Sequence, residues 1–386
     1  MINSTQKIST IKNLNFNLIS DGSKNSINLK EINEIQTFHN TLDNKATPLI
    51  NLNSLARYLG VNKIFLKDES QRFGLNAFKA LGSSYAIYKN IKKYPEIKTF
   101  CTATDGNHGR SVAWMAKKLG KKAVVFVPEG TAFNRIRVIE EEGAKVIIVK
   151  DDYDTAVKMA CKYVYDNNHK YKKQSHSLIQ DTSWKDYHKI PIDIMKGYWT
   201  QMVEVTKQIS NEKIDFVFLQ VGVGSWAASV IDFIVMHWEN HPLFISVEPN
   251  SANCLFQSID KGKMVTVNSD QFTSMAGLNC QSISTIAWPI LKNGIFGCMS
   301  IPDEITEEAM RILAKPLSGD PSIISGESGA SGLGALIALI KDQRCKEFRN
   351  SILINENSNI LVINTEGDTD PVNYKNIVSQ SKKIIV

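Results

Sequence analysis

A lysine that directly follows an aromatic residue is the first group in this sequence with the means to do covalent chemistry. Lys79 follows Phe78, and the spacing of Phe78, Leu81, Tyr85 and Tyr88 predicts a helix that begins at this point. A protonated amine at the positive end of a helix dipole is disfavoured. The position makes sense if the amine is desolvated and forms an imine with a carbonyl compound. Taken by itself, this segment still favours a surface lysine at a helix start by a modest margin.

The segment TATDGNHG at residues 102–109 leads from an apolar stretch into a second predicted helix, and it supplies the candidate site residues Thr104, Asp105, Gly106, Asn107 and His108. Exposed N–H groups at a helix start bind anions such as a carboxylate. The Asn107 amide can donate to an oxygen such as that of a pyridinol. A helix cap formed by Asp105 or Asn107 explains the same residues without a ligand, and a lone histidine is more often structural than catalytic.

Glycines follow the apolar run at residues 216–221, in the order Gly222, Val223, Gly224, Ser225 and Trp226. A strand that passes through glycines into a helix forms a cradle for phosphate, because the backbone N–H groups point at the ligand. The same residues also match the dinucleotide fingerprint G-x-G-x-x-A, and Glu248 ends the next strand, where an acid can hold a ribose. A nicotinamide-dependent oxidoreductase is therefore an alternative at this point.

Two further segments combine glycines with short polar residues. Residues 325–330 (SGESGA) precede a small, glycine-rich helix at residues 331–340, for which tight helix–sheet packing is the simpler interpretation. Residues 364–370 (NTEGDTD) follow the last apolar strand, and the Thr365 hydroxyl can face a ring nitrogen, although an acidic turn explains the segment equally well. All five segments occur at strand ends or helix starts, where α/β sheets bind their ligands.

The elements that position these segments alternate between strands and helices. Apolar runs predict buried strands at residues 123–127, 146–149, 216–221, 243–247 and 360–363. Helical periods follow residue 107, ending at Gly120, and cover residues 132–142, ending at Gly143. Continuous apolar strands suit a parallel sheet that is covered on both faces, so the fold class is α/β.

The domain organisation predicted from this alternation is discontinuous. Residues 1–84 and 200–386 form a large domain, and residues 85–199 form a small domain inserted into it. The first 45 residues, rich in Asn, Ser and Lys, are expected to be a loosely structured arm with a short helix near residues 29–42.

Composition excludes several classes of function. The chain has 386 residues with 43% hydrophobic and 22% charged content, and its net charge of +6 comes from scattered basic residues, so we expect no nucleic-acid partner. The N-terminus lacks the apolar core of a signal peptide, and no window approaches the roughly 18 apolar residues of a membrane helix. The six cysteines form no CxxC pair, so no metal site is expected. A cytoplasmic enzyme with reduced thiols is the expectation.

Taken together and in this order, the five segments resemble the fold type II pyridoxal-phosphate (PLP) enzymes, the group of the tryptophan synthase β-subunit and threonine dehydratase. Within that group, the sequence is most similar to the diaminopropionate ammonia-lyases. The likeness lies in FLKDESQRFGLNAFKALG (65–82), ATDGNHGRSVAW (103–114), QDTSW (180–184), VEPNSANC (247–254), MAGLNC (275–280), ISGESGASGLG (324–334) and NTEGDTDP (364–371). Threonine dehydratases usually have a serine where this chain has Asp105, and QDTSW contributes Asp181.

The resemblance implies two lobes, each with a mainly parallel open sheet flanked by helices, and it implies PLP as cofactor. Lys79 holds the cofactor as a Schiff base, Asn107 contacts the pyridinol oxygen, and Thr365 lies near the pyridine nitrogen. The phosphate is held by backbone N–H groups of Gly222, Val223, Gly224, Ser225 and Trp226. Trp226 is a departure from the small residues usual at this point, and it either crowds the loop or points into a lobe interface.

The resemblance also implies the reaction. Lys79, Asp105 and Asp181 are the catalytic groups, and the small amino-acid substrate contacts Thr104, Asp105, Gly106, His108 and Asp181. We expect α,β-elimination of 2,3-diaminopropionate to pyruvate and two ammonia in a homodimer. A serine/threonine ammonia-lyase is the alternative, followed by the NAD-dependent oxidoreductase. Cys254 and Cys280 fall in family-like segments near the pocket, where isolated buried thiols are favoured over a close pair.

Overall fold

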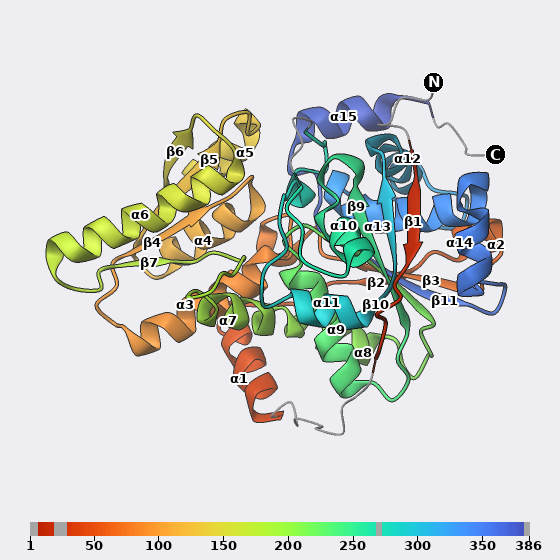
Figure 1. Ribbon diagram of the computed structural model, residues 1–386, viewed down its shortest axis with the longest axis horizontal. Coiled ribbons are helices and arrows are strands. Elements are labelled where there is room, and N and C mark those ends of the chain that lie inside the picture. The colour runs from red at the N-terminus through yellow and green to blue at the C-terminus, as the bar shows by residue number, and fades with distance from the viewer. Residues whose placement is uncertain (1–6, 19–28, 268–271, 382–386) are drawn as a thin grey trace.

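The computed structural model describes residues 7–18, 29–267 and 272–381, which fold around two separate sheets (Figure 1). The larger sheet has the strand order β1-β10-β9-β8-β11-β3-β2 and the smaller one the order β6-β5-β4-β7. The strands of the larger sheet are β1 (Ser9–Lys12), β2 (Leu49–Asn51), β3 (Lys63–Asp68), β8 (Phe216–Gln220), β9 (Leu243–Pro249), β10 (Ile295–Ile301) and β11 (Asn359–Asn364). Those of the smaller sheet are β4 (Thr99–Ala103), β5 (Lys122–Pro128), β6 (Lys145–Val149) and β7 (His176–Leu178).

Helices cover both sheets. Those of the first half of the chain are α1 (Leu29–Asn40), α2 (Asn53–Leu59), α3 (Lys79–Lys93), α4 (Asn107–Lys118), α5 (Phe133–Glu141), α6 (Tyr153–Tyr171), α7 (Lys189–Gly197) and α8 (Trp199–Gln208). Those of the second half are α9 (Ser225–His237), α10 (Cys254–Lys261), α11 (Trp288–Gly294), α12 (Asp303–Ala314), α13 (Glu327–Lys341), α14 (Lys346–Ile352) and α15 (Pro371–Ser379). None of the helices in the described part of the chain has the length and apolar character that crossing a bilayer requires.

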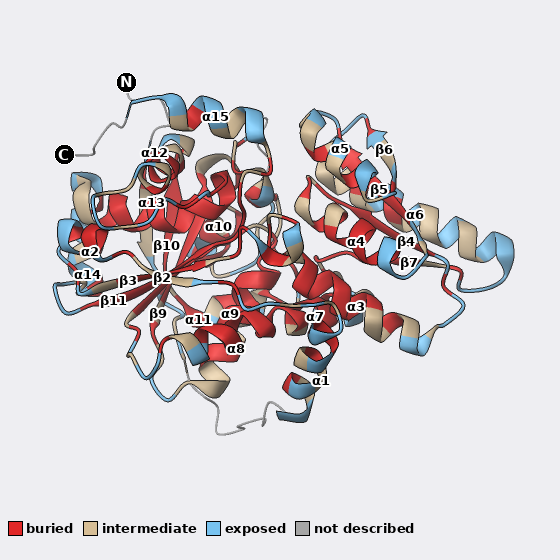
Figure 2. Ribbon diagram, turned by 180° about the vertical axis from the view of Figure 1, so that it is seen from behind, coloured by how far each residue is buried: buried red, intermediate tan, exposed pale blue. Residues whose placement is uncertain are grey.

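The larger sheet is buried on both faces. Along β11, Leu361 and Ile363 belong to one hydrophobic core while Ile360 and Val362 belong to the other. Successive side chains of a strand point to opposite faces, so this alternation places one core on each side of the sheet. Figure 2 shows the resulting burial of the central strands and of the helices that pack on them. The double cover explains why the strand reads as a continuous apolar run.

The smaller sheet is parallel throughout, with β4 pairing to both β5 and β7 and β5 pairing to β6. One of its faces packs on α6 through Val124, Phe126 and Ala156. Phe100 and Val125 belong instead to the large core that also contains residues of α3 and α4. The α/β fold with two mainly parallel sheets flanked by helices is therefore confirmed, and each strand predicted from an apolar run is present.

The N-terminal arm differs from the prediction. Residues 9–12 form β1, which pairs antiparallel with β10 in the register Ser9↔Ser300. The four residues are polar or half-buried and show no apolar run, so only their backbone pairing reveals the strand. The predicted helix near residues 29–42 is present as α1, Leu29–Asn40. Residues 1–6 and 19–28 of the arm lie outside the described residues.

Candidate active site

Every residue that the sequence predicts for the site lines one pocket, which lies where the strands of the two sheets end. Loops after β4 and β7 supply the residues around Asp105 and Asp181, and loops after β8 and β11 supply the glycines and Thr365. Parallel strands bring their carboxyl ends to one edge, so segments far apart in sequence converge there. The strand-end pattern seen in the sequence is thus the physical reason that these side chains meet.

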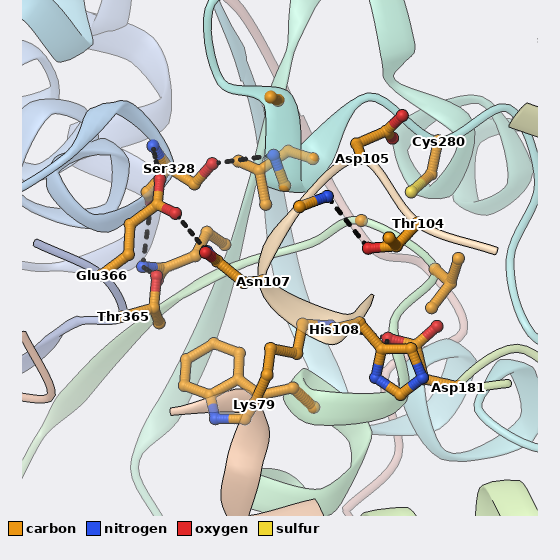
Figure 3. A pocket seen from close by; sticks show the side chains of 18 of the residues that line it. Lys79, Thr104, Asp105, Asn107, His108, Asp181, Cys280, Ser328, Thr365 and Glu366 are labelled. Atoms are coloured by element: carbon orange, nitrogen blue, oxygen red, sulfur yellow. Dashed lines mark hydrogen bonds and ion pairs between the residues drawn. The ribbon is translucent and has the colours of Figure 1, made fainter. Parts of the chain in front are cut away.

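Lys79, the first residue of α3, forms an ion pair with Asp181 in which the Nζ–Oδ2 distance is 2.7 Å (Figure 3). Burial would lower the pKa of Lys79, but the Asp181 carboxylate outweighs burial and raises it. Burial would likewise raise the pKa of Asp181, but Lys79 and then His108 bring it down to about 2. The amine is therefore protonated and the acid ionised, and each stabilises the charge of the other.

His108 is the second group that faces Asp181, with its Nδ1 at 3.8 Å from Oδ2. Its Nε2 lies 2.7 Å from the carbonyl oxygen of Ile179. Because a carbonyl oxygen only accepts, Nε2 carries the proton, and burial lowers the pKa of the ring. The neutral ring thus presents an unprotonated Nδ1 to the pocket, and this atom has no hydrogen-bond partner among the described residues.

Asp105 is the other acid of the pocket and behaves differently from Asp181. Burial raises the pKa of Asp105 to about 7, with Asp181 adding to the rise and the Arg135 guanidinium opposing it. A carboxyl group with this pKa exchanges a proton readily near neutral pH. The pKa values of the two acids in this pocket are therefore moved in opposite directions, that of Asp181 down and that of Asp105 up.

Two backbone loops meet in the pocket beyond β8. Gly224 has φ 88°, in the left-handed region, and precedes α9, whose first turn has no side-chain cap. A Cβ atom at Gly222 would lie 2.8 Å from the backbone oxygen of Gly277, which belongs to the short helical turn Ala276–Leu278. The uncapped N–H groups at the start of α9 can therefore receive an anion that no side chain displaces.

Polar side chains on the β11 side complete the pocket. Asn107 donates to Oε2 of Glu366 at 2.5 Å, and Oε1 of the same acid accepts from the N–H of Ser328 at 3.0 Å. The Thr365 hydroxyl oxygen accepts from Nε2 of Gln220 at 3.1 Å. Its own hydrogen is then available to an acceptor in the pocket, such as a ring nitrogen.

Comparison with known proteins identifies the family. Residues 41–365 match the pyridoxal-phosphate-dependent enzymes. The chain belongs to this family. It is 41% identical to the diaminopropionate ammonia-lyase of Salmonella typhimurium, over 89% of this chain and 91% of that protein. The crystal structure of Escherichia coli diaminopropionate ammonia-lyase with an aminoacrylate-PLP azomethine intermediate has a TM-score of 0.88, 36% identity and 99% coverage of both chains. The biosynthetic L-threonine dehydratase of Staphylococcus epidermidis is less similar, at 24% identity over 87% of this chain and 73% of that protein.

The residues present fit the cofactor of this family. The Lys79 amine can react with the aldehyde of the cofactor. The uncapped start of α9, which Gly224 precedes, can bind its phosphate. The Thr365 hydroxyl hydrogen can be donated to its ring nitrogen. The buried Oε1 of Gln220 also has no partner within the described residues, so this oxygen is free to accept a hydrogen bond from a ligand in the pocket. The site is thus chemically complete for pyridoxal phosphate.

Glu248 does not support the oxidoreductase alternative. The side chain is fully buried, and its two oxygens accept from the N–H groups of Leu255 and Phe256 at 2.7 Å each. These bonds cap the start of α10, so the carboxyl group is already used as a structural group. Membership of the pyridoxal-phosphate family and the geometry of Glu248 both disfavour a nicotinamide cofactor.

The Trp226 side chain does not fill the space at the glycine loop, residues 222–226. Its indole N–H donates to Oε1 of Gln201 on α8 at 2.9 Å, and its ring lies 5.4 Å from the ring of Phe78. The side chain therefore packs against α8 and beside the residue that precedes Lys79. Cys254 and Cys280 are both buried free thiols, and only Cys280 lines the pocket.

The sequence did not point to two pocket residues on helices beside the smaller sheet, Arg135 and Tyr153. Arg135 lies on α5, which follows β5, and Tyr153 is the first residue of α6, which follows β6. Both strands were predicted, so applying the strand-end rule to them as well would have found these side chains. An arginine on an amphipathic helix otherwise reads as part of a solvated face.

Proposed function

We propose that the protein catalyses the pyridoxal-phosphate-dependent α,β-elimination of 2,3-diaminopropionate to pyruvate and two molecules of ammonia. The observation that carries the proposal is the presence of two acids, Asp105 and Asp181, in one pocket with Lys79. The names of the two diaminopropionate ammonia-lyases that resemble this chain support it.

The substrate explains why the pocket has two carboxyl groups. 2,3-Diaminopropionate carries a second amino group at Cβ, and an ammonium in this place is complemented by a nearby carboxylate. The neutral hydroxyl of serine or threonine needs no such partner. Desolvation at the half-buried Asp105 makes a carboxylate there costly unless a cation or a proton transfer uses it.

Different residues of the pocket serve the two ends of the reaction, one at the substrate Cα and one at the amino group that leaves from Cβ. When bound, pyridoxal phosphate withdraws electrons from the substrate Cα and so acidifies its hydrogen. Asp105, with a pKa of about 7, is suited to accept this proton. The free Lys79 amine, itself protonated beside Asp181, keeps the Cβ amino group in its ammonium form, so that this group departs as neutral ammonia. The unsaturated product released to water hydrolyses to pyruvate and a second ammonia.

Two acids in one pocket provide one candidate base for each stereoisomer of the substrate. Asp105 follows β4 and Asp181 follows β7, so the acids enter the pocket from different loops. We infer that each acid removes the Cα proton of one enantiomer, since the hydrogen points to opposite sides in the D- and L-forms. The backbone at Thr104, Gly106 and His108 then receives the substrate carboxylate.

Three further assignments belong to this proposal. The chain acts as a homodimer, as the resemblance implies. It works in the cytoplasm, which suits its six free cysteines. Its domains are residues 1–84 with 200–386 and residues 85–199, a division that agrees with the ranges over which the two sheets draw their strands.

Pyruvate formation from D- and L-diaminopropionate, with serine and threonine as controls, tests the function. We expect turnover of at least one diaminopropionate enantiomer with kcat/KM well above that for either hydroxy amino acid. Asp105→Asn should reduce turnover of diaminopropionate more than that of serine. Faster release of pyruvate from serine, unaffected by Asp105→Asn, would establish the dehydratase instead.

A further inference from the structure

Arg135 places a buried cation beside the loop that carries Asp105. Its side chain is 8% exposed and lines the pocket from α5. A Cβ atom added to Gly106 would lie 3.2 Å from Cδ of Arg135, so the aliphatic part of the arginine packs directly on this loop. The aliphatic part of Arg135 is thus held against the residue that follows Asp105, whereas no guanidinium nitrogen lies within 4.0 Å of an Asp105 carboxyl oxygen in the described structure.

The guanidinium has few partners for its five N–H donors. Its Nη2 lies 3.9 Å from Oε2 of Glu327 on α13, which is too long for a hydrogen bond. Its Nε is buried with no hydrogen-bond partner among the described residues. The other oxygen of Glu327 accepts instead from the Asn373 side chain. A buried arginine with this much unused capacity indicates a further acceptor in the pocket.

Asp105 is the acceptor that lacks a donor. No hydrogen bond to its carboxyl group occurs among the described residues, whereas the Asp181 carboxylate accepts from Lys79. Asp105 and Arg135 are near enough for the arginine charge to lower the pKa of the acid against the effect of burial.

We propose that Arg135 is the positioning residue for Asp105, acting through its guanidinium charge to favour the carboxylate form of that acid. The proposal rests on the proposed function, in which Asp105 accepts the Cα proton of one substrate enantiomer. Arg135 acts through Asp105 in this scheme and touches neither the cofactor nor the reacting atoms.

The other groups that face Asp105 do not replace Arg135. Asp181 raises the pKa of Asp105 through like-charge repulsion. Tyr153 of α6 and Cys280 also face it, and burial raises the pKa of both, so they remain neutral near pH 7. The Lys79 ammonium is already paired with Asp181. Within the described residues, Arg135 is therefore the cation left to hold Asp105 in its basic form.

The test compares Arg135→Gln and Arg135→Lys in the holoenzyme, with Arg137→Gln as the matched control. Arg137 lies on the same helix, but its side chain is 58% exposed and pairs with Glu141. For the enantiomer whose turnover depends on Asp105, the rising limb of kcat/KM against pH should move up by about one unit or more in Arg135→Gln. Arg135→Lys, which keeps the charge but not the fork, should give a smaller shift. The other enantiomer and Arg137→Gln should show no shift.

A second readout is independent of turnover. The carboxyl stretch of Asp105, obtained as the infrared difference between wild type and Asp105→Asn, reports its protonation directly. Its midpoint should rise in Arg135→Gln. An unchanged midpoint, with KM raised equally for both enantiomers, would overturn the proposal and make Arg135 a ligand of the substrate carboxylate. If wild type releases no pyruvate from diaminopropionate, the proposed function fails, while the infrared titration still decides the role of Arg135. If Arg135→Gln does not fold, the same titration of Arg135→Lys decides it.

Discussion

Lys79 and Asp181 form a partly buried ion pair across 102 residues of sequence, with Nζ donating to Oδ2 at 2.7 Å. The lysine begins a helix next to the larger sheet, and the acid follows β7 of the smaller sheet. The pair therefore exists only when both sheets are correctly placed. It also sets the protonation of the lysine, because Asp181 raises the pKa of the amine.

The ion pair predicts how the apoenzyme takes up its cofactor. The Lys79 amine must lose its proton to react with the aldehyde, so Asp181→Asn, which removes the partner that raises the pKa of Lys79, should move the pH dependence of cofactor uptake to lower pH. Stopped-flow absorbance after adding pyridoxal phosphate at a series of pH values measures this. Asp186→Asn, an exposed acid of the same loop, is the control and should leave the curve in place.

Lys79→Ala should abolish the visible absorption band of the lysine-bound cofactor and reduce pyruvate release by about 10³-fold or more. The spectrum of the dialysed protein is the measurement. Lys89→Ala removes an amine of the same helix that is paired with Glu34 at 3.4 Å and lies over the Tyr85 ring, and this variant should keep both the band and the activity. A Lys79→Ala enzyme with the band intact would assign the cofactor to a different lysine.

Gly224→Ala should lower both stability and cofactor affinity, because its Cβ would lie 2.6 Å from Cδ1 of Leu291 in addition to the strain of φ 88°. Gly60→Ala is the matched control, since Gly60 has φ 74° but nothing within 4 Å of the added atom. The control should cost about 1 kcal/mol from backbone strain and leave affinity unchanged. Urea unfolding and cofactor titration of both variants separate strain from contact. Equal losses of stability in the two variants would show that the Leu291 side chain moves away from the added methyl group without a measurable loss of stability.

A buried charge network outside the pocket lining predicts a large effect on stability. Glu204 accepts from Lys67 at 2.8 Å and from Arg72 at 2.7 Å, and both cations are fully buried. Glu204→Gln leaves part of that positive charge uncompensated and should destabilise the fold by about 3–5 kcal/mol in urea unfolding. Glu212→Gln, which removes the half-exposed partner of Lys63, should cost about 1 kcal/mol or less. A Glu204→Gln loss as small as this control would mean that solvent reaches the network.

The same network predicts a pH dependence of stability. Burial alone would raise the pKa of Glu69, but Arg72, followed by Lys67, lowers it from its ordinary value of 4.5 to about 2. Because the folded pKa is depressed, this contribution is fully present above pH 4.5 and is lost as pH falls from 4.5 towards 2. Urea midpoints at pH 3 and pH 6 should therefore differ less in Glu69→Gln than in wild type. The same difference in both proteins would contradict the assignment.

Much of the site follows from one sequence pattern. Lys79, Asp105, Asn107 and Thr365 were found because each stands at a strand end or helix start in a segment of short polar residues, and parallel strands bring such ends together. Asp181 follows only the three-residue strand β7, so the family resemblance rather than the pattern located it.

What the sequence did not predict depends on tertiary contacts. The strand β1 is defined by its backbone pairing with β10 and carries no apolar signature. Arg135 reads as a surface residue of α5 until the helix is seen to cover the loop at Gly106. In both cases the structure depends on a contact with a residue distant in sequence, and a local sequence pattern does not contain this information.

The position of β11 has a consequence for synthesis of the protein on the ribosome. This last strand, residues 359–364, lies between β8 and β3 in the middle of the larger sheet, whereas the smaller sheet is complete once residue 178 has emerged. The nascent chain must therefore keep two halves of an apolar sheet apart until nearly all of it has been translated. During this interval the exposed edges of β3 and β8 are open to wrong pairing, which makes the yield of native enzyme sensitive to chaperones and to translation rate.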